Sequence, residues 1–256
     1  MLKSSLIGIL FLLTLDIPIL PGAGESKIDS PENQITEEHK TLAIGAEAPD
    51  FSLPDVDGKI YSLKDFQYAK ILVVVFMCNH CPTSQAYEQR MIQLTLDYKS
   101  KNVAIVAINP NHPGSVRLDE LGYSDLGDSF DEMKIRSLDA GFNFSYLYDG
   151  ETETVSKKFG PVCTPHIFIF DQARKLRYNG RIDDTENPQR TPHSQDTRNA
   201  IEALLNNQEI AVTVTKVFGC SIKWEKNQTG FKKQQSNGLL NQCIWIPSAS
   251  MEYRSL

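Results

Sequence analysis

The stretch that decides the fold is KILVVVFMCNHCPTSQAYEQRMIQLTLDY, Lys70 to Tyr98. It opens with KILVVVF, a continuous run of β-branched and other apolar residues, which predicts a strand buried on both faces. From Thr83 to Tyr98, apolar and aromatic residues recur along one face of a helix, which predicts an amphipathic helix. Cys78 and Cys81 therefore fall where the predicted strand ends and the predicted helix begins.

The flanking sequence extends this unit into a larger α/β domain. A second apolar run, NVAIVAIN (102–109), follows the helix, and the order strand, helix, strand implies a right-handed parallel crossover. Upstream, Asp57-Gly58 separates two short β-like pieces and predicts a hairpin. Downstream, we expect strands in FSYLYD, PHIFIFD and KLRYNGRI, the last two paired through a turn at 172–174. Helices are expected at 130–140, 151–159 and 194–207, the last one capped by Ser194 or Asp196. The result is a mixed β-sheet with helices on both faces.

The ends of the chain differ from this domain in composition. Residues 1–24 have one lysine, an apolar run and then small residues, which predicts a secretory signal peptide and an exported, periplasmic or secreted protein. Asp16, Pro18 and Pro21 interrupt the run, so no stable membrane span is expected. Residues 25–42 predict a flexible leader, 43–207 the folded domain and 208–256 a C-terminal extension. The net charge of -6 gives no basic surface for nucleic acid.

The two cysteines at the strand end allow several interpretations. A helix N-terminus carries partial positive charge and free N–H groups, which lower a thiol pKa, so Cys78 is a candidate thiolate and Cys81 its disulfide partner. His80 would add positive charge if protonated. A structural pair is the alternative, but an all-cysteine zinc site needs a second close pair, and the other three cysteines of the 256-residue chain are isolated in sequence. Pro82 stands where a haem-attachment motif needs histidine.

A second signal lies at Thr164-Pro165, directly before the predicted strand PHIFIFD. A proline entering a central strand removes a ladder hydrogen bond, unless the chain makes a special turn there. A cis peptide bond at Pro165 would provide that turn and expose backbone for an extended substrate. An ordinary trans proline at a strand start is the alternative, and the upstream cysteine pair favours the cis form.

With these motifs, the sequence resembles the thioredoxin-fold redoxin superfamily. The segments GAEAPDFSLPDVDGKIYSLKDF, ILVVVFMCNHCP, VAIVAIN and VCTPHIFIFD carry the resemblance, which spans about 43–224. This superfamily includes the alkyl hydroperoxide reductase/thiol-specific antioxidant group and TlpA-like proteins. It is strongest to a peroxiredoxin-like subgroup with a CNHCP motif and a GCSIKW tail. The resemblance implies a thioredoxin-like fold and redox-active cysteines. Met77 and Asn79-His80 replace the usual Trp and Gly-Pro, and the peroxiredoxin signature before the first cysteine is absent.

The leading functional hypothesis is a thiol-disulfide oxidoreductase acting on a protein disulfide or dithiol partner. Cys78 would attack as the thiolate, Cys81 would resolve the mixed disulfide, and Thr164-Pro165 would hold the partner backbone. His80 would modulate the reduction potential of the cysteine pair. No cofactor and no resident metal are expected, and the sequence leaves the oligomeric state open.

Two other functions remain open from the sequence. In a thiol peroxidase, Cys78 would become a sulfenic acid and condense with a second thiol. In a copper-binding or copper-delivery protein, His166 would join the cysteine pair as a ligand. Cys163 is expected near the pair, either as a third redox thiol or as a buried core residue. Cys220 and Cys243 are expected to form a structural bridge in the tail.

Overall fold

The computed structural model describes residues 40–121, 126–185, 187 and 190–225. The predicted signal peptide (1–24), the predicted leader up to residue 39 and the tail from residue 226 lie outside the described residues. No helix in the described part of the chain is long and apolar enough to cross a bilayer.

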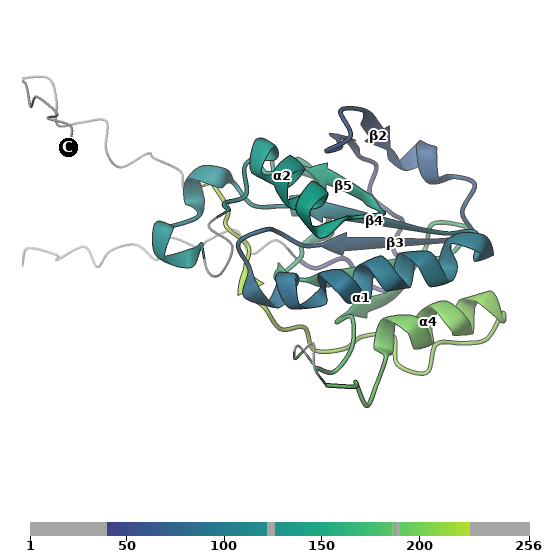
Figure 1. The fold of residues 1–256 in the computed structure, drawn as a ribbon. Coiled ribbons are helices and arrows are strands. Elements are labelled where there is room, and N and C mark those ends of the chain that lie inside the picture. Colours follow the sequence, from purple (N-terminus) through teal and green to yellow (C-terminus); the bar gives the residue numbers. More distant parts are fainter. Residues whose placement is uncertain (1–39, 122–125, 186, 188–189, 226–256) are drawn as a thin grey trace, which may run out of the picture. The chain divides into compact units, whose positions relative to one another are not determined.

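A five-stranded mixed sheet forms the centre of the domain, in the order β5-β4-β3-β7-β8 (Figure 1). The first three of these strands run parallel, and β7 and β8 run antiparallel to their neighbours. The central strand β3 and its neighbours β4 and β7 are buried along their whole length, as the apolar runs predicted. The strands are β3 (Ile71–Phe76), β4 (Val103–Asn109), β5 (Ser145–Tyr148), β7 (His166–Phe170) and β8 (Leu176–Gly180).

Alternate residues of β3 point into two separate apolar layers. Val73 and Val75 belong to a layer shared with α1, α2 and α4, whereas Val74 and Phe76 belong to a layer closed by α3 and the N-terminal hairpin. This period of two follows from the pleat of a strand. The helices are α1 (Pro82–Tyr98), α2 (Phe130–Ala140), α3 (Thr154–Phe159) and α4 (Asp196–Leu205), and the hairpin strands are β1 (Ser52–Pro54) and β2 (Ile60–Ser62). The predicted mixed sheet with helices on both faces and an N-terminal hairpin is confirmed.

Two predicted helix starts are wrong, and the backbone shows why. The helix predicted from residue 151 begins at Thr154, because Glu153 adopts the left-handed conformation with φ 55° and the Asp149 carboxylate accepts the N–H of Ser156. At α4 the capping residue is Gln195, whose side chain makes no cap hydrogen bond. The expected cap Asp196 is instead the first helical residue, and it binds Arg181 at 2.6 Å.

The first described part of the C-terminal extension lies against the sheet edge and then against the site. Val214 forms a parallel bridge with Asn179 on β8, and the Thr215 hydroxyl lies 2.7 Å from that of Tyr178. Further on, β9 (Cys220–Ser221) pairs antiparallel with β6 (Cys163–Thr164). The segment 210–225 is therefore fixed to the domain along two separate strands.

Candidate functional site

The two cysteines occupy the connection between β3 and α1, as the sequence predicted. β3 ends at Phe76, and α1 begins at Pro82, which takes the first helical position, where a missing N–H costs no hydrogen bond. Cys81 is the N-cap, and its sulfur accepts the backbone N–H of Ser84 at 3.4 Å. The helix thus directs its positive end at the Cys81 sulfur.

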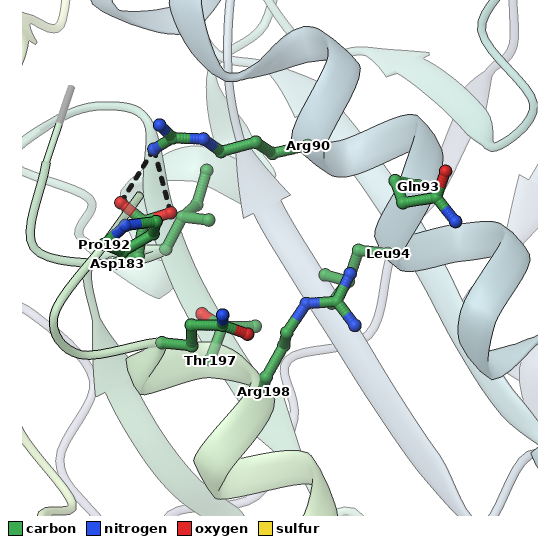
Figure 2. A pocket seen from close by; sticks show the side chains of 9 residues that line it. Arg90, Gln93, Leu94, Asp183, Pro192, Thr197 and Arg198 are labelled. Atoms are coloured by element: carbon green, nitrogen blue, oxygen red, sulfur yellow. Dashed lines mark hydrogen bonds and ion pairs between the residues drawn. The ribbon is translucent and has the colours of Figure 1, made fainter. Parts of the chain in front are cut away.

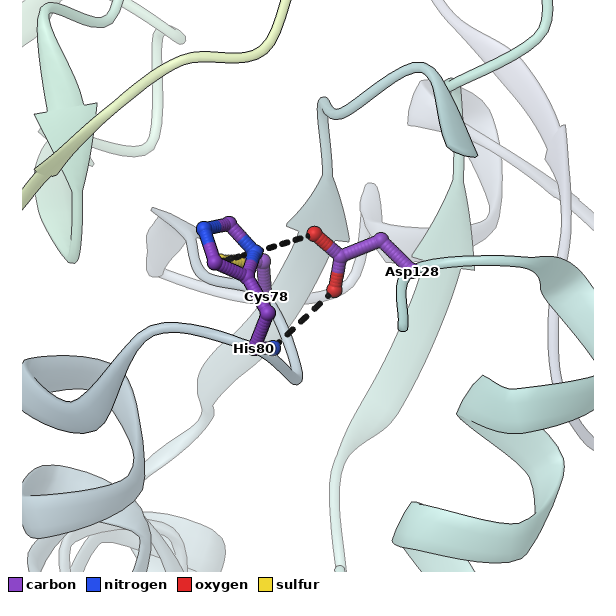
Figure 3. Close-up of side chains that lie close together, drawn as sticks. All are labelled: Cys78, His80 and Asp128. Atoms are coloured by element: carbon purple, nitrogen blue, oxygen red, sulfur yellow. Dashed lines mark hydrogen bonds and ion pairs between the residues drawn. The ribbon is translucent and has the colours of Figure 1, made fainter. Parts of the chain in front are cut away.

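Cys78 lies deeper, in a buried polar cluster. Its sulfur is 3.1 Å from the Thr164 hydroxyl and 3.5 Å from Nδ1 of His80, and only 1% of the residue is exposed. Figure 3 shows Cys78 and His80 lying together, with Asp128 facing the imidazole. Burial raises the pKa of the Cys78 thiol, and the nearby Cys81 and Asp128 raise it further. Cys78 is therefore held as a neutral thiol in this structure.

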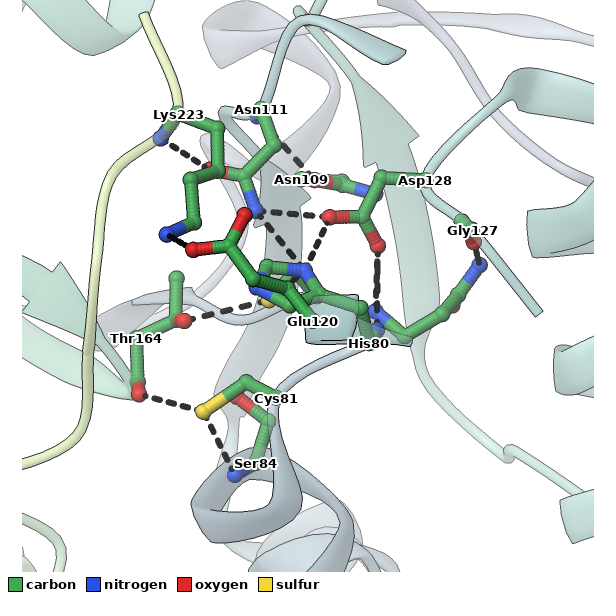
Figure 4. A network of polar contacts seen from close by, with 12 residues as sticks. His80, Cys81, Ser84, Asn109, Asn111, Glu120, Gly127, Asp128, Thr164 and Lys223 are labelled. Atoms are coloured by element: carbon green, nitrogen blue, oxygen red, sulfur yellow. Dashed lines mark hydrogen bonds and ion pairs between the residues drawn. The ribbon is translucent and has the colours of Figure 1, made fainter. Parts of the chain in front are cut away.

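Asp128 organises the loop that carries the cysteines. Its carboxylate accepts the backbone N–H groups of Asn79 at 2.8 Å and His80 at 3.2 Å, and lies 2.6 Å from Nδ1 of His80. Asn111 donates its side-chain amide to the same carboxylate at 2.7 Å (Figure 4). Neither Asp128 nor Asn111 was predicted, because both stand in a Pro-, Gly- and Asp-rich loop whose path the sequence does not define.

The charge distribution of the pair differs from the sequence-based expectation. The pKa of Cys81, not that of Cys78, is lowered by its interactions with the neighbouring thiols of Cys220 and Cys78 and by the N–H of Ser84, which donates to its sulfur. When protonated, Cys81 instead donates to the carbonyl oxygen of Thr164 at 3.1 Å. The structure thus favours a thiolate at Cys81 with Cys78 as its protonated neighbour, because Cys81 is the residue that caps the helix.

Thr164 contacts both cysteines, through its hydroxyl to Cys78 and through its carbonyl to Cys81. The peptide bond between Thr164 and Pro165 is cis. The adjacent Cys163 is buried, and its thiol points to the carbonyl oxygen of Pro165 at 3.7 Å. Burial raises the pKa of Cys163 to about 12, so this thiol is a weak nucleophile at neutral pH.

His166 does not have the free ring nitrogen that a copper ligand needs. Its Nδ1 accepts the N–H of Val162 at 3.3 Å, so its Nε2 carries the proton and donates to Asn179 at 2.8 Å. The expectation that His166 joins the cysteines as a ligand is therefore wrong. Among the described residues, donor atoms of Cys78, His80 and Asp128 do lie within 4.8 Å of one another. Those groups are already hydrogen-bonded among themselves.

The buried state of His166 predicts a loss of stability in mild acid. Burial lowers its pKa from 6.5 to about 4, so below pH 6.5 the unfolded chain takes up a proton that the folded protein does not. We expect this residue to remove about 3 kcal/mol of the unfolding free energy as the pH falls from 6.5 towards 4. Urea unfolding of the wild type and His166→Gln across this range measures it, because glutamine can keep a hydrogen bond to Asn179 without titrating. Parallel losses in both proteins would contradict it.

A separate cavity of about 200 Å³ lies between α1 and α4 (Figure 2). Both arginines in its wall already have partners. Arg90 binds the Asp183 carboxylate and the carbonyl oxygens of the 185–190 loop, and Arg198 pairs with Asp97 at 2.6 Å. The cavity therefore has no unpaired guanidinium to attract an anion, and the cysteine pair remains the candidate site.

The sheet, the helix start and the paired thiols define a thioredoxin-like protein with a buried cysteine pair. The sequence matches the AhpC/TSA family over residues 44–179, just over half of the chain. The chain belongs to this family, and the predicted redoxin resemblance and oxidoreductase class are confirmed.

Individual proteins resemble this chain in sequence or in structure. The crystal structure of a hypothetical protein from Sinorhizobium meliloti 1021 has a TM-score of 0.65 and 29% identity, and covers 73% of this chain and 97% of that one. An uncharacterized conserved protein from Geobacillus kaustophilus has a TM-score of 0.63 and 35% identity, covering 72% and 93%. Thiol-disulfide oxidoreductase ResA of Bacillus thuringiensis subsp. konkukian is 26% identical over 147 residues, 57% of this chain and 73% of its own.

Proposed function

We propose that the protein is a thiol-disulfide oxidoreductase in which Cys78 and Cys81 interconvert between a dithiol and a disulfide. One observation carries the proposal: at the N-terminus of α1, Thr164 contacts both sulfurs, with its hydroxyl 3.1 Å from Cys78 and its carbonyl oxygen 3.1 Å from Cys81. A thiolate beside a thiol is the reduced form that exchanges with an external disulfide. A relative named thiol-disulfide oxidoreductase supports this chemistry.

The exchange uses the residues that surround the pair. A thiolate of the pair attacks the partner's disulfide, one partner sulfur leaves as thiolate, and the second cysteine then displaces the other partner sulfur and closes the Cys78–Cys81 bond. The Thr164 hydroxyl and His80 lie at the Cys78 sulfur, where they can stabilise negative charge once Cys81 enters a disulfide. Cys78 as the attacking thiol, Cys81 as the resolving thiol and Thr164-Pro165 as the docking segment remain predictions.

A redox titration tests the Cys78–Cys81 bond directly. Cys220→Ser removes the neighbouring thiol, and the protein is equilibrated in dithiothreitol buffers of increasing oxidised fraction. After quenching with acid and alkylation, we expect peptide mapping to show Cys78 and Cys81 passing together from two alkylated thiols to one disulfide. If both remain alkylated in fully oxidising buffer, the proposed function is wrong.

Peroxide is a second candidate substrate, because one contact favours it. The signature before Cys78 lacks the hydroxyl that peroxiredoxins use, but Thr164 places its hydroxyl 3.1 Å from the Cys78 sulfur. Attack by the Cys78 thiolate on peroxide would give a sulfenic acid, and Cys81 would condense with it and release water. Stopped-flow peroxide consumption separates this function from disulfide exchange, since a rate no faster than that of a free thiol excludes it.

The partner and location follow from the same proposal. A protein disulfide or dithiol is the expected substrate, and an exported protein would meet it in an oxidising compartment. Export is proposed on the N-terminal sequence alone, which lies outside the described residues. N-terminal sequencing of the mature protein tests it, with cleavage after Gly24 as the expected result.

A further inference from the structure

The C-terminal strand β9 covers the segment where a partner backbone was expected to dock. Thr164, the residue before Pro165, pairs with Cys220, and Cys163 pairs with Ser221. The approach is close at Gly219, where an added Cβ would clash with the carbonyl oxygen of Thr164. With φ 145°, Gly219 also has a backbone conformation that other residues rarely adopt. The chain itself therefore occupies this edge of β6.

Side chains and backbone on both sides hold β9 in place. Lys223 donates its N–H to Asn111 at 2.9 Å, and its carbonyl accepts the N–H of His112 at 2.9 Å. Its ammonium pairs with Glu120 at 2.6 Å, as Figure 4 shows. On the other side, the Phe218 ring packs 6.3 Å from Tyr87 of α1. These contacts join β9 to the loop that holds Asp128 and to the helix that follows the cysteines. β9 therefore forms part of the wall of the site.

This placement brings a third thiol to the cysteine pair. Cys220 is the strand partner of Thr164, and the carbonyl oxygen of Thr164 accepts the Cys81 thiol at 3.1 Å, so Cys220 lies beside Cys81. Cys220 is only partly buried, unlike Cys78 and Cys81. Cys163, for which the sequence left open a role as a third redox thiol or as a buried core residue, instead points to the Pro165 carbonyl. The expected Cys220–Cys243 bridge stays a prediction, because Cys243 lies outside the described residues.

We infer that Cys220 is a third redox-active thiol, which attacks Cys81 of the Cys78–Cys81 disulfide and carries the bond to the partly exposed end of the site. This inference rests on the proposed function, which supplies the first disulfide. Cys220 loses its proton, a Cys81–Cys220 bond forms, the Cys78–Cys81 bond breaks, and the electron pair and a proton go to the Cys78 sulfur. The step is an exchange with no net oxidation.

The electrostatics of the reduced site are consistent with this order of events. In the dithiol form, the Cys81 thiolate keeps Cys220 protonated, because their hydrogen bond is the largest cause that raises the pKa of Cys220. Once Cys81 is part of a disulfide, that negative charge is absent. Cys220 then loses the interaction that held its proton, and Lys223 nearby favours its thiolate. The released Cys78 sulfur returns to the Thr164 hydroxyl.

Disulfide mapping of the purified full chain tests the inference. Four proteins are compared: wild type, Cys78→Ser, Cys220→Ser and the control Cys163→Ser. Each is equilibrated in dithiothreitol buffers of increasing oxidised fraction, quenched with acid, alkylated and digested. In Cys78→Ser we expect Cys81–Cys220 to become the main disulfide. In wild type and in Cys163→Ser we expect the Cys81–Cys220 disulfide to coexist with the Cys78–Cys81 disulfide. A Cys81–Cys163 or Cys220–Cys243 bond in its place would overturn the inference. If Cys78–Cys81 forms in Cys220→Ser but Cys81–Cys220 never forms, the inference fails and the proposed function stands.

A backbone variant supplies an independent readout that leaves every cysteine in place. Gly219→Ala adds a Cβ against the Thr164 carbonyl, so we expect β9 to be displaced, the Cys81–Cys220 peptide to be lost and Cys78–Cys81 to remain. Gly141→Ala is the matched control, because Gly141 also has a positive φ, 68°, but open space around it. Retention of Cys81–Cys220 in Gly219→Ala at the level of the control would contradict the role of β9.

Discussion

Cys78→Ser and Cys81→Ser, each introduced into a Cys220→Ser background so that Cys220 cannot replace the missing thiol, are expected to reduce the disulfide-exchange rate to that of the reaction without enzyme. Exchange needs one thiolate to attack and a second thiol to release the mixed disulfide, and a hydroxyl can do neither. Both sulfurs contact Thr164, and a single replacement leaves the remaining thiol without its disulfide partner. Reduction of a disulfide-containing protein substrate by dithiothreitol, followed by turbidity or fluorescence, measures the rate.

The two variants should differ in what they trap. Cys81→Ser keeps the Cys78 thiol and should accumulate a mixed disulfide with the partner if Cys78 attacks. Cys78→Ser should accumulate it instead if the Cys81 thiolate attacks. Cys163→Ser is the matched control, because the Cys163 thiol points to the Pro165 carbonyl and its replacement should leave the rate unchanged. Full activity in either Cys78→Ser or Cys81→Ser would rule out the dithiol mechanism.

Asp128→Ala is expected to lower the unfolding free energy by about 3–5 kcal/mol, the range for breaking a buried charged network. The carboxylate is 1% exposed and accepts hydrogen bonds from Asn79, His80 and Asn111. Alanine would leave these buried donors without a partner, and each unsatisfied group costs about 1–3 kcal/mol. Urea or guanidinium unfolding followed by circular dichroism measures the change.

Asp128→Asn separates the charge of this residue from its shape. Asparagine can still accept the N–H groups of Asn79 and His80 through its amide oxygen, but it places no negative charge beside the imidazole. We therefore expect a smaller loss of stability than in Asp128→Ala. Since the negative charge of Asp128 contributes to the raised pKa of Cys78, alkylation of Cys78 in Cys81→Ser should be faster when asparagine replaces this aspartate. Equal stability of Asp128→Ala and the wild type would contradict the proposal that the Asp128 carboxylate stabilises this loop.

Local patterns account for the parts of the fold that the sequence predicted well. The apolar run of β3 and the helical spacing of α1 are short-range signals, and both elements end within about one residue of their predicted limits. The two elements together define the strand-to-helix junction, so the sequence also predicted the position of Cys78 and Cys81. The starts of α3 and α4 were missed because Asp149 and Arg181 act there through side chains that no periodicity reveals.

The rest of the site depends on long-range packing. Asp128 contacts His80 across 48 positions of sequence, and Thr164 contacts Cys78 across 86 positions. Thr164 could be expected there because a proline before a strand is a recognisable local signal. Cys220 had no such signal, since an isolated cysteine in the C-terminal extension does not show which surface it contacts. The same limit explains why Cys163, near Pro165 in sequence, was considered as a third thiol and Cys220 was not.

The pairing of β9 with β6 also determines how strongly a partner must bind. A strand tethered through a short connection is present at its binding edge at an effective concentration of about millimolar. Any peptide arriving from solution at Thr164 must compete with this built-in ligand, whose Gly219 fits the edge and whose Lys223 is held by Glu120. Peptides that bind weakly would be excluded at ordinary cellular concentrations. A partner that docks at Thr164, as proposed, must therefore pair with this edge better than β9 does.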